Sequence, residues 1–300
     1  MRIHLDTDLG GDPDDVCALA LLLRSPDAEI TGITTVLDGD GQRAAYTSHV
    51  LELAGCSGVP VIAGAGRTLT GNQARPDGVW PDLPPQPAAP GAALDALAAS
   101  VAQGATVIAI GPLTNLGLLE TVRPGTLAAA DVVVMGGHLG PPTEGLPQWG
   151  PEMDWNIQFD TRAARIVAAA AGHLTLVTLP ATMSAWLRAE EAPRLRAAGP
   201  LGELLAEQSR AHAEAAGFPE LGRTHPGLPD DLLNFHYDPV TVAVALGWPV
   251  FKQCEMRLET QLDQDVLRFA PSSRGHTARV VTDVDGTAFS RRWLSTISPR

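Results

Sequence analysis

The first residues with an evident capacity for chemistry are aspartates crowded into a short stretch near the N-terminus. Five of them fall within ten residues, namely Asp6, Asp8, Asp12, Asp14 and Asp15. The N-terminus of a helix stabilises a nearby carboxylate by only about 0.3–1 kcal/mol, which does not offset so many charges. A hard cation such as Ca²⁺, which takes about six to eight oxygen ligands, does offset them. We therefore expect a divalent-metal site in this segment.

Other structures also place acidic residues where a strand meets a helix. A helix cap needs a single Asp, and an EF-hand loop needs Glu at its twelfth position. Counted from Asp6, that position is Cys17. A haloacid-dehalogenase-like, metal-dependent phosphatase also begins with a strand and a DxD pattern. It remains an alternative, although Leu9-Gly10-Gly11 replaces its usual Thr or Val and no phosphate-binding Lys motif follows.

The elements that must position these acids alternate between apolar strands and helices. Strands are predicted at 2–5, 29–36, 60–63, 106–110, 132–135 and 174–178, and helices at 14–23, 43–54, 92–102, 114–120 and 161–170. Strands that are apolar on both faces and separated by helices predict an α/β fold with a mostly parallel sheet flanked by helices. Ligands bind such sheets at the carboxyl ends of the strands, which is where the acidic segment should lie.

The second half of the chain is less regular. Residues 188–216 are predicted to be helix-rich and to lie outside the sheet, followed by helices at 238–246 and near 289–297 and by a late antiparallel hairpin or meander over 251–269 and 277–282. The Pro- and Gly-rich segments 71–90 and 140–151 have no predicted structure, and loops of this length are usually functional. Since no repeat or linker is evident, we expect a single domain over residues 1–300.

The composition excludes several classes of protein. Hydrophobic residues make up 45% of the chain, so a large core is expected, and 34 acidic against 21 basic residues give a net charge of −13. This charge disfavours a nucleic-acid partner. The chain has no apolar run of about 20 residues that would predict a membrane span. Its opening, MRIHLDTD, lacks the pattern of a signal peptide. We expect a cytoplasmic protein without a membrane or nucleic-acid partner.

The acidic segment and seven later segments resemble the inosine–uridine-preferring nucleoside hydrolase family. The family pattern strand-DxDxG…DD-helix matches residues 6–15, with two extra residues in the turn. The other similar segments are ITGITTV (30–36), VPVIAGAGRTL (59–69), IGPLTNL (110–116), VVMGGHLG (133–140), DWNIQFD (154–160), YDPVTVAVAL (237–246) and DVDGTAFSRRWL (283–294). The resemblance implies a nucleoside hydrolase-like fold and hydrolysis of the N-glycosidic bond of a ribonucleoside or related riboside, releasing ribose and free base for purine or pyrimidine salvage.

The resemblance also implies roles for single residues. The metal ligands would be Asp8, Asp15, the backbone carbonyl of Thr114, and Asp238, and Asp8 would also take a proton from water. The ribose contacts would be Asp14, Met135, Gln148, Asp154 and Asn156. The expected cofactor is one Ca²⁺ ion per chain, with Mg²⁺ less favoured, and the expected assembly is a homo-oligomer, either a dimer or a tetramer.

Departures from the family pattern gather in the half of the site that would hold the base. Where the family has a His before the late Asp, this chain has Tyr237, preceded by His236, and these two are the candidate acids for the leaving base. Asp40 and Trp80 are candidate substrate contacts, and Trp149, Trp155 and Trp186 could also stack on a base. His225 and Asn234 precede the late Asp in a segment that could form a lid. The nucleobase therefore stays open, and a catalytically weak riboside-binding homologue is a further alternative.

Overall fold

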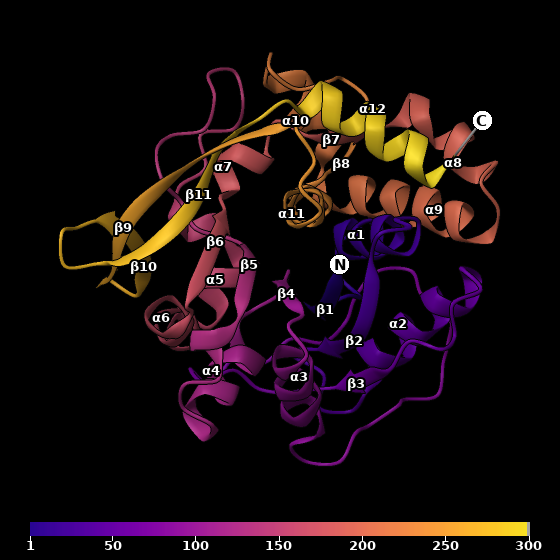
Figure 1. The fold of residues 1–300 in the computed structure, drawn as a ribbon. Coiled ribbons are helices and arrows are strands. Elements are labelled where there is room, and N and C mark those ends of the chain that lie inside the picture. Colours follow the sequence, from indigo (N-terminus) through magenta and orange to yellow (C-terminus); the bar gives the residue numbers. More distant parts are fainter. Residues whose placement is uncertain (299–300) are drawn as a thin grey trace.

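A nine-stranded sheet forms the centre of the computed structural model, which describes residues 1–298 (Figure 1). Its strands are β1 (Arg2–Thr7), β2 (Glu29–Thr35), β3 (Val61–Ala63), β4 (Thr106–Ala109), β5 (Asp131–Met135), β6 (His173–Val177), β9 (Phe251–Asp263), β10 (Val266–Pro271) and β11 (His276–Val284). The order is β10-β9-β11-β6-β5-β4-β1-β2-β3. All neighbours from β3 to β11 pair in parallel, and β9 is antiparallel to β10 and β11. The predicted fold class is confirmed.

Helices cover both faces of the sheet (Figure 1). They are α1 (Asp14–Leu23), α2 (Gln42–Leu53), α3 (Ala92–Ala102), α4 (Thr114–Val122), α5 (Trp155–Phe159), α6 (Thr161–Ala170), α7 (Leu179–Thr182), α8 (Ala192–Arg196), α9 (Pro200–Ala216), α10 (Phe218–Thr224), α11 (Tyr237–Ala245) and α12 (Gly286–Ile297). Successive strand side chains point to opposite faces. Ile108 thus joins the core under α1, α11 and α12, whereas Val107 joins the core under α3, α4 and α6.

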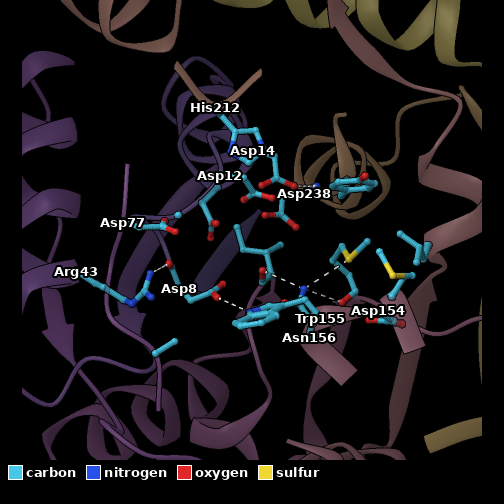
Figure 2. A pocket seen from close by; sticks show the side chains of 18 of the residues that line it. Asp8, Asp12, Asp14, Arg43, Asp77, Asp154, Trp155, Asn156, His212 and Asp238 are labelled. Carbon is cyan, nitrogen blue, oxygen red and sulfur yellow. Dashed lines mark hydrogen bonds between the residues drawn. The ribbon is translucent and has the colours of Figure 1, made fainter. Parts of the chain in front are cut away.

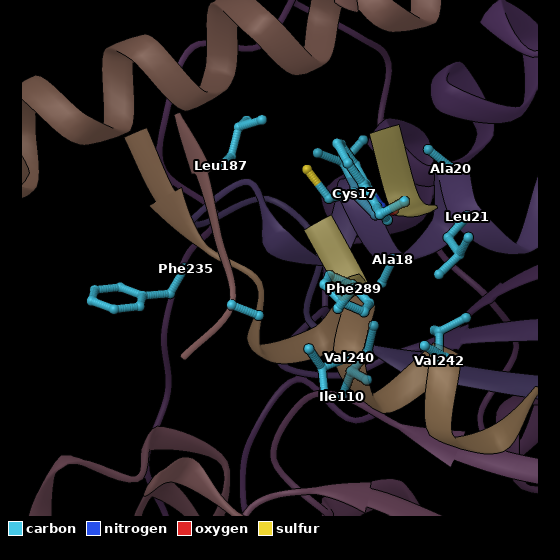
Figure 3. Close-up of a cluster of buried hydrophobic side chains, with 14 of the residues drawn as sticks. Cys17, Ala18, Ala20, Leu21, Ile110, Leu187, Phe235, Val240, Val242 and Phe289 are labelled. Atoms are coloured by element: carbon cyan, nitrogen blue, oxygen red, sulfur yellow. The ribbon is translucent and has the colours of Figure 1, made fainter. Parts of the chain in front are cut away.

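The first of these cores fixes the two helices that matter most for the site. Figure 3 shows Cys17 and Ala18 of α1 close to Val240 and Val242 of α11 and to Phe289 of α12. All five side chains are fully buried. Because α1 and α11 pack on each other through apolar residues, their N-terminal turns are held side by side at one edge of the sheet.

The strand order reverses direction at β1. The chain runs outward from β1 through β2 to β3, and then returns to place β4 on the other side of β1. Such a switch point leaves a crevice at the carboxyl ends of the two central strands. Asp8 follows β1 and Ile110 follows β4, so the acidic segment opens onto this crevice, as the sequence predicted.

Most predicted elements of the parallel half agree with the structure to within two residues. The predicted segment 251–269 contains two strands, because Gln264 and Asp265 form a turn with positive φ angles of 47° and 69°. The sequence did not predict β7 (Trp186–Arg188) and β8 (Leu232–Phe235), a separate antiparallel pair around the helix-rich segment. Strands of three or four residues are too short for a periodic pattern to indicate them.

Two further predictions concern the chain as a whole. Within residues 1–298, no helix is long and apolar enough to cross a membrane. The predicted domain spans residues 1–300, and its last two residues lie outside the described part of the chain. The segment 71–90 contains no helix or strand, although part of it lines the cavity described next.

Candidate active site

A cavity of about 380 Å³ lies where the central strands end, and its wall is strongly acidic (Figure 2). Seven aspartates line it, namely Asp8, Asp12, Asp14, Asp15, Asp77, Asp154 and Asp238. The basic residues on the wall are Arg43, Arg75 and His212. Ile110 and Met135 contribute from the ends of β4 and β5. Residues from the first helix, the strand ends and α11 therefore meet around one space.

Three of the four predicted metal ligands, Asp8, Asp15 and Asp238, lie on this wall. The Thr7 hydroxyl donates to Asp15, and the Trp155 indole Nε1 donates to Asp8 Oδ2 over 3.1 Å. The backbone N–H of Asp238 donates to Asp14 Oδ2 over 3.4 Å, although the two residues are 224 positions apart. These contacts hold carboxylates from both ends of the chain in a single group.

Asp12 belongs to the same group, although its sequence position suggested no particular role. Within residues 1–298, the carboxylates of Asp12, Asp14 and Asp15 offer oxygens that all lie within 4.8 Å of one another. Asp8 and Asp238 complete the wall around this trio. The extra residues in the turn thus bring an additional acid to the site.

The charge on these carboxylates is poorly compensated within the protein. Burial raises the pKa of Asp8 to about 6, an effect that Arg43 opposes and Asp12 reinforces. Burial raises the pKa of Asp14, Asp15 and Asp238 as well, and the neighbouring carboxylates add to it. Hard anionic oxygens crowded in this way are the donor set that Ca²⁺ and Mg²⁺ prefer. The residues present therefore fit a divalent cation.

Arg43 contributes the positive charge closest to the acidic group. Its buried guanidinium donates to the backbone carbonyls of Asp8 and Leu9, the latter over 3.2 Å. A third donation, over 3.4 Å, reaches the carbonyl of Leu37. Arg43 therefore holds the loop after β1 against the loop after β2, because its donors bind backbone oxygens from both.

Asp154 and Asn156, the predicted ribose contacts at the start of α5, line another side of the cavity. Asp154 accepts the backbone N–H of Gly137 over 2.6 Å and that of Ile157 over 3.2 Å. Burial raises the pKa of Asp154 to about 7, and these two N–H groups oppose the shift. The Asn156 amide donates to the carbonyls of Ile110 and Met135, both over 3.1 Å. Two polar side chains are thereby fixed beside the acidic group.

The fourth predicted metal ligand is the backbone carbonyl of Thr114. This residue opens α4 and is absent from the cavity wall, and its hydroxyl donates to Asp160 Oδ2 over 2.7 Å. Thr114 lies in the first turn of α4, a helix that packs on the opposite face of the sheet from α1 and α11. The residue of this segment that does line the cavity is Ile110, four positions earlier.

Of the two candidate acids for the leaving base, Tyr237 lies on the cavity wall and His236 does not. The His236 ring is fully buried between Trp293 and Phe289, at centroid distances of 4.5 and 5.6 Å. Neither ring nitrogen has a hydrogen-bond partner within residues 1–298, and burial lowers the pKa of His236 to about 3. A group in this position cannot reach a substrate.

Three predicted substrate contacts lie away from the cavity. Asp40 is exposed and accepts the N–H of Gln42 over 3.3 Å. Gln148 donates to the carbonyls of Thr143 and Leu146 and lines a separate, shallow cavity. Trp80 stacks on Tyr46, with centroids 4.6 Å apart. Each side chain is engaged locally, which its sequence position did not reveal.

The two candidate lid residues are similarly displaced. His225 lines the shallow cavity, and Asn234 is fully buried in β8. The wall instead carries His212 from α9, a residue that sequence reasoning missed because its helix was predicted to lie outside the sheet. Of the tryptophans considered for base stacking, Trp149 and Trp155 line the cavity and Trp186 does not.

Solved structures of nucleoside hydrolases share this fold. The chain superposes on a plant nucleoside hydrolase, PpNRh1, with a TM-score of 0.82 at 20% identity, covering 100% of this chain and 99% of the other. For the purine-preferring ribonucleoside hydrolase from Gardnerella vaginalis the TM-score is 0.82 at 22% identity, covering 99% and 98%. The fold is therefore that of the nucleoside hydrolases.

Sequence comparison identifies the family. The model of the inosine-uridine preferring nucleoside hydrolase family matches residues 3–291. The pyrimidine-specific ribonucleoside hydrolase RihA of Salmonella agona (strain SL483) is 31% identical over 223 residues, covering 69% of this chain and 70% of the relative. The chain belongs to the inosine-uridine preferring nucleoside hydrolase family. It is a metal-dependent enzyme that hydrolyses ribonucleosides to ribose and free base, and the phosphatase alternative is not supported.

Proposed function

We propose that the acidic cavity is the active site and that it holds one Ca²⁺ ion through Asp8, Asp15 and Asp238. The observation that carries this proposal is the convergence of these three carboxylates on one wall from opposite ends of the chain. The backbone carbonyl of Ile110 replaces that of Thr114 in the predicted ligand set, because Ile110 lines the cavity.

The number of acids supports Ca²⁺ over Mg²⁺. Ca²⁺ accepts about six to eight oxygens in a flexible arrangement, whereas Mg²⁺ requires a near-ideal octahedron and keeps several waters. Asp12 and Asp14 lie within 4.8 Å of Asp15 through their oxygens and offer additional ligands. A crowded, irregular set of carboxylates suits the larger ion.

The protein groups divide the chemistry between them. The bound ion would lower the pKa of a water and fix the sugar hydroxyls. Asp8 accepts the proton of that water as it attacks the anomeric carbon, and the Trp155 indole restrains the Asp8 carboxylate. Asp14, Asp154 and Asn156 bind the ribose hydroxyls. Their negative charge and dipoles stabilise the positive charge that develops on the ribose.

The base-binding side is defined by aromatic residues. Trp149 and Trp155 line the cavity, and an aromatic face can stack on any nucleobase. The relatives include a pyrimidine-specific and a purine-preferring hydrolase, and we propose a ribonucleoside substrate whose base stacks on one of these rings. We further propose that the protein acts in nucleoside salvage in the cytoplasm. We also propose that it forms a single domain and assembles as a dimer or tetramer.

The decisive experiment is a reducing-sugar assay across a panel of purine and pyrimidine ribonucleosides. We expect ribose release that a chelator abolishes and that Ca²⁺ restores better than Mg²⁺. Release that persists after complete metal removal would contradict the metal proposal. Tight nucleoside binding without any ribose release would instead support a riboside-binding homologue.

A further inference from the structure

A histidine that belongs to none of the segments compared with the family lies on the wall of the cavity. Among the described residues, His212 contributes the sole imidazole to this wall, and its side chain is partly exposed. Figure 2 shows it across the acidic group from Trp155 and Asn156. Asp8 and His212 therefore approach the same space from different sides, as a base and an acid acting on one bond must do.

The His212 imidazole is held in place by a chain of aromatic contacts. It packs edge-on against Phe218, with centroids 5.2 Å apart at 77°. Phe218 packs at 5.6 Å and 86° against Phe235, which in turn stacks on Tyr237 at 5.2 Å. The imidazole is thereby fixed relative to Tyr237, itself a residue of the cavity wall.

A second contact fixes the helix that carries His212. One turn earlier on α9, the buried Gln208 amide donates to the carbonyl of Val79. Val79 belongs to the segment 71–90, from which Ala74 and Arg75 also line the cavity. The position of His212 is thus tied to the segment 71–90, part of which lines the same cavity.

The other candidate acids are less suitable. His236 is buried away from the cavity. His138 is bonded through Nε2 to the carbonyl of Trp149 over 2.9 Å, and His225 lines a different cavity. A phenol such as Tyr237, with an ordinary pKa of about 10, is a weak acid near neutral pH, whereas His is the side chain used most often for this task.

We propose that His212 is the catalytic acid that protonates the departing nucleobase. In this step the C1′–N bond breaks and its electron pair goes to the base, which takes a proton from the His212 imidazolium. Water adds its hydroxyl to C1′ and gives its remaining proton to Asp8. Asp8 then returns this proton to His212 through solvent, which restores both residues. One water is therefore consumed for each bond that is broken. The inference rests on the proposed function, with Asp8 as the base.

The test compares two leaving groups in the His212→Gln variant. With uridine and inosine, whose bases must be protonated, kcat should fall by about 10²–10⁴-fold. With p-nitrophenyl riboside, kcat should fall less than about threefold. Its phenolate leaves without a proton, so the loss of a proton donor hardly affects this reaction. His225→Gln, the same change at a histidine of the other cavity, should leave both rates unchanged.

Each loss of kcat is measured relative to the wild type, and each variant is first checked for correct folding. Equal losses with both leaving groups, or no loss with either, would overturn the role of His212. If His212→Gln folds poorly, His212→Ala with added imidazole replaces it, and rescue confined to the nucleosides supports the proposal while no rescue contradicts it. Ribose release by the wild type tests the proposed function separately.

Discussion

At the scale of the residue, a carboxylate acts according to its surroundings more than to its place in a motif. Asp8 and Asp40 both follow strands of the parallel sheet. Asp8 lines the cavity, with its carboxylate bonded by Trp155, whereas Asp40 lies on the surface beside Gln42. Substitution of an exposed acid away from such a site usually changes the stability of a protein only slightly.

This difference gives the first prediction. Asp8→Asn should lower kcat for nucleosides by at least about 10²-fold, because an amide cannot accept the proton of the attacking water. Asp40→Asn, the same substitution at the exposed position, should change kcat by less than twofold, within the usual small effect of a surface change. Steady-state kinetics with saturating Ca²⁺ measure both. Comparable losses in the two variants would show that Asp40 reaches the site.

At the scale of the element, β1 buries a polar side chain as well as carrying the site. The ring of His4 bonds Ser100 Oγ over 2.8 Å and Thr34 Oγ1 over 3.1 Å. Burial lowers the pKa of His4 to about 4. The histidine is therefore a neutral, buried residue of β1 itself, the strand that leads into the acidic cavity.

The second prediction follows from this shift in pKa. The unfolded chain protonates His4 near pH 6.5, and the folded chain does so only near pH 4. Between these values the unfolded state binds more protons, so the stability from His4 is complete above pH 6.5 and is lost as the pH falls toward 4, by up to about 3 kcal/mol. In metal-free urea unfolding, His4→Asn should lose less stability over this window than the wild type.

The control for this measurement is His276→Asn, a change at an exposed histidine. Its free energy of unfolding should follow the wild-type pH dependence. Buried carboxylates such as Asp6 contribute in the opposite sense, because burial raises the pKa of Asp6 to about 7. The difference between variant and wild type isolates His4, and parallel curves for His4→Asn would contradict the prediction.

A third prediction concerns α9 and the loop that it holds. Replacing Gln208 with Leu removes its hydrogen bond to the Val79 carbonyl, which costs roughly 0.5–1.5 kcal/mol. We expect faster proteolysis within 71–90 and a raised KM, because Ala74 and Arg75 line the cavity. Glu207→Leu puts the same side chain on the exposed face of α9 and should change neither. An unchanged rate of proteolysis in Gln208→Leu would show that the segment 71–90 keeps its conformation without the Gln208 hydrogen bond.

At the scale of the whole molecule, the site links the two ends of the chain. Asp8, Asp14 and Asp15 come from the first strand and helix, and Asp238 comes from α11. The packing of α1 on α11 brings these buried acids together, with Arg43 compensating only part of their charge. A cation bound among them therefore stabilises the folded state and not the unfolded chain.

The fourth prediction is a metal-dependent melting temperature. At about 100 times its dissociation constant, Ca²⁺ should add about 2.7 kcal/mol of stability, a rise on the order of 5 °C for a chain of this size. Calorimetry after chelation and after addition of Ca²⁺ or Mg²⁺ measures it. Asp15→Asn should abolish the rise, and an undiminished rise in that variant would place the ion elsewhere.

The sequence by itself determined the class of fold and the acidic half of the site. Periodicity records which residues are buried, so the alternating strands and helices predicted the parallel sheet. Asp8, Asp14 and Asp15 are neighbours along the chain and follow a strand of a predicted parallel sheet, whose carboxyl ends are where ligands bind. Asp238 was predicted as a metal ligand only from the family resemblance, because no pattern of neighbouring residues connects it to the N-terminal aspartates.

Only the tertiary structure decided which side chains face the cavity. Thr114 and Ile110 lie four residues apart, yet α4 takes the first to the opposite face of the sheet. A shift of one residue separates buried His236 from Tyr237 on the wall. His212 reaches the site because α9 folds back over it. Local patterns encode burial and backbone form, but the direction of a side chain depends on packing between distant elements, which no local pattern contains.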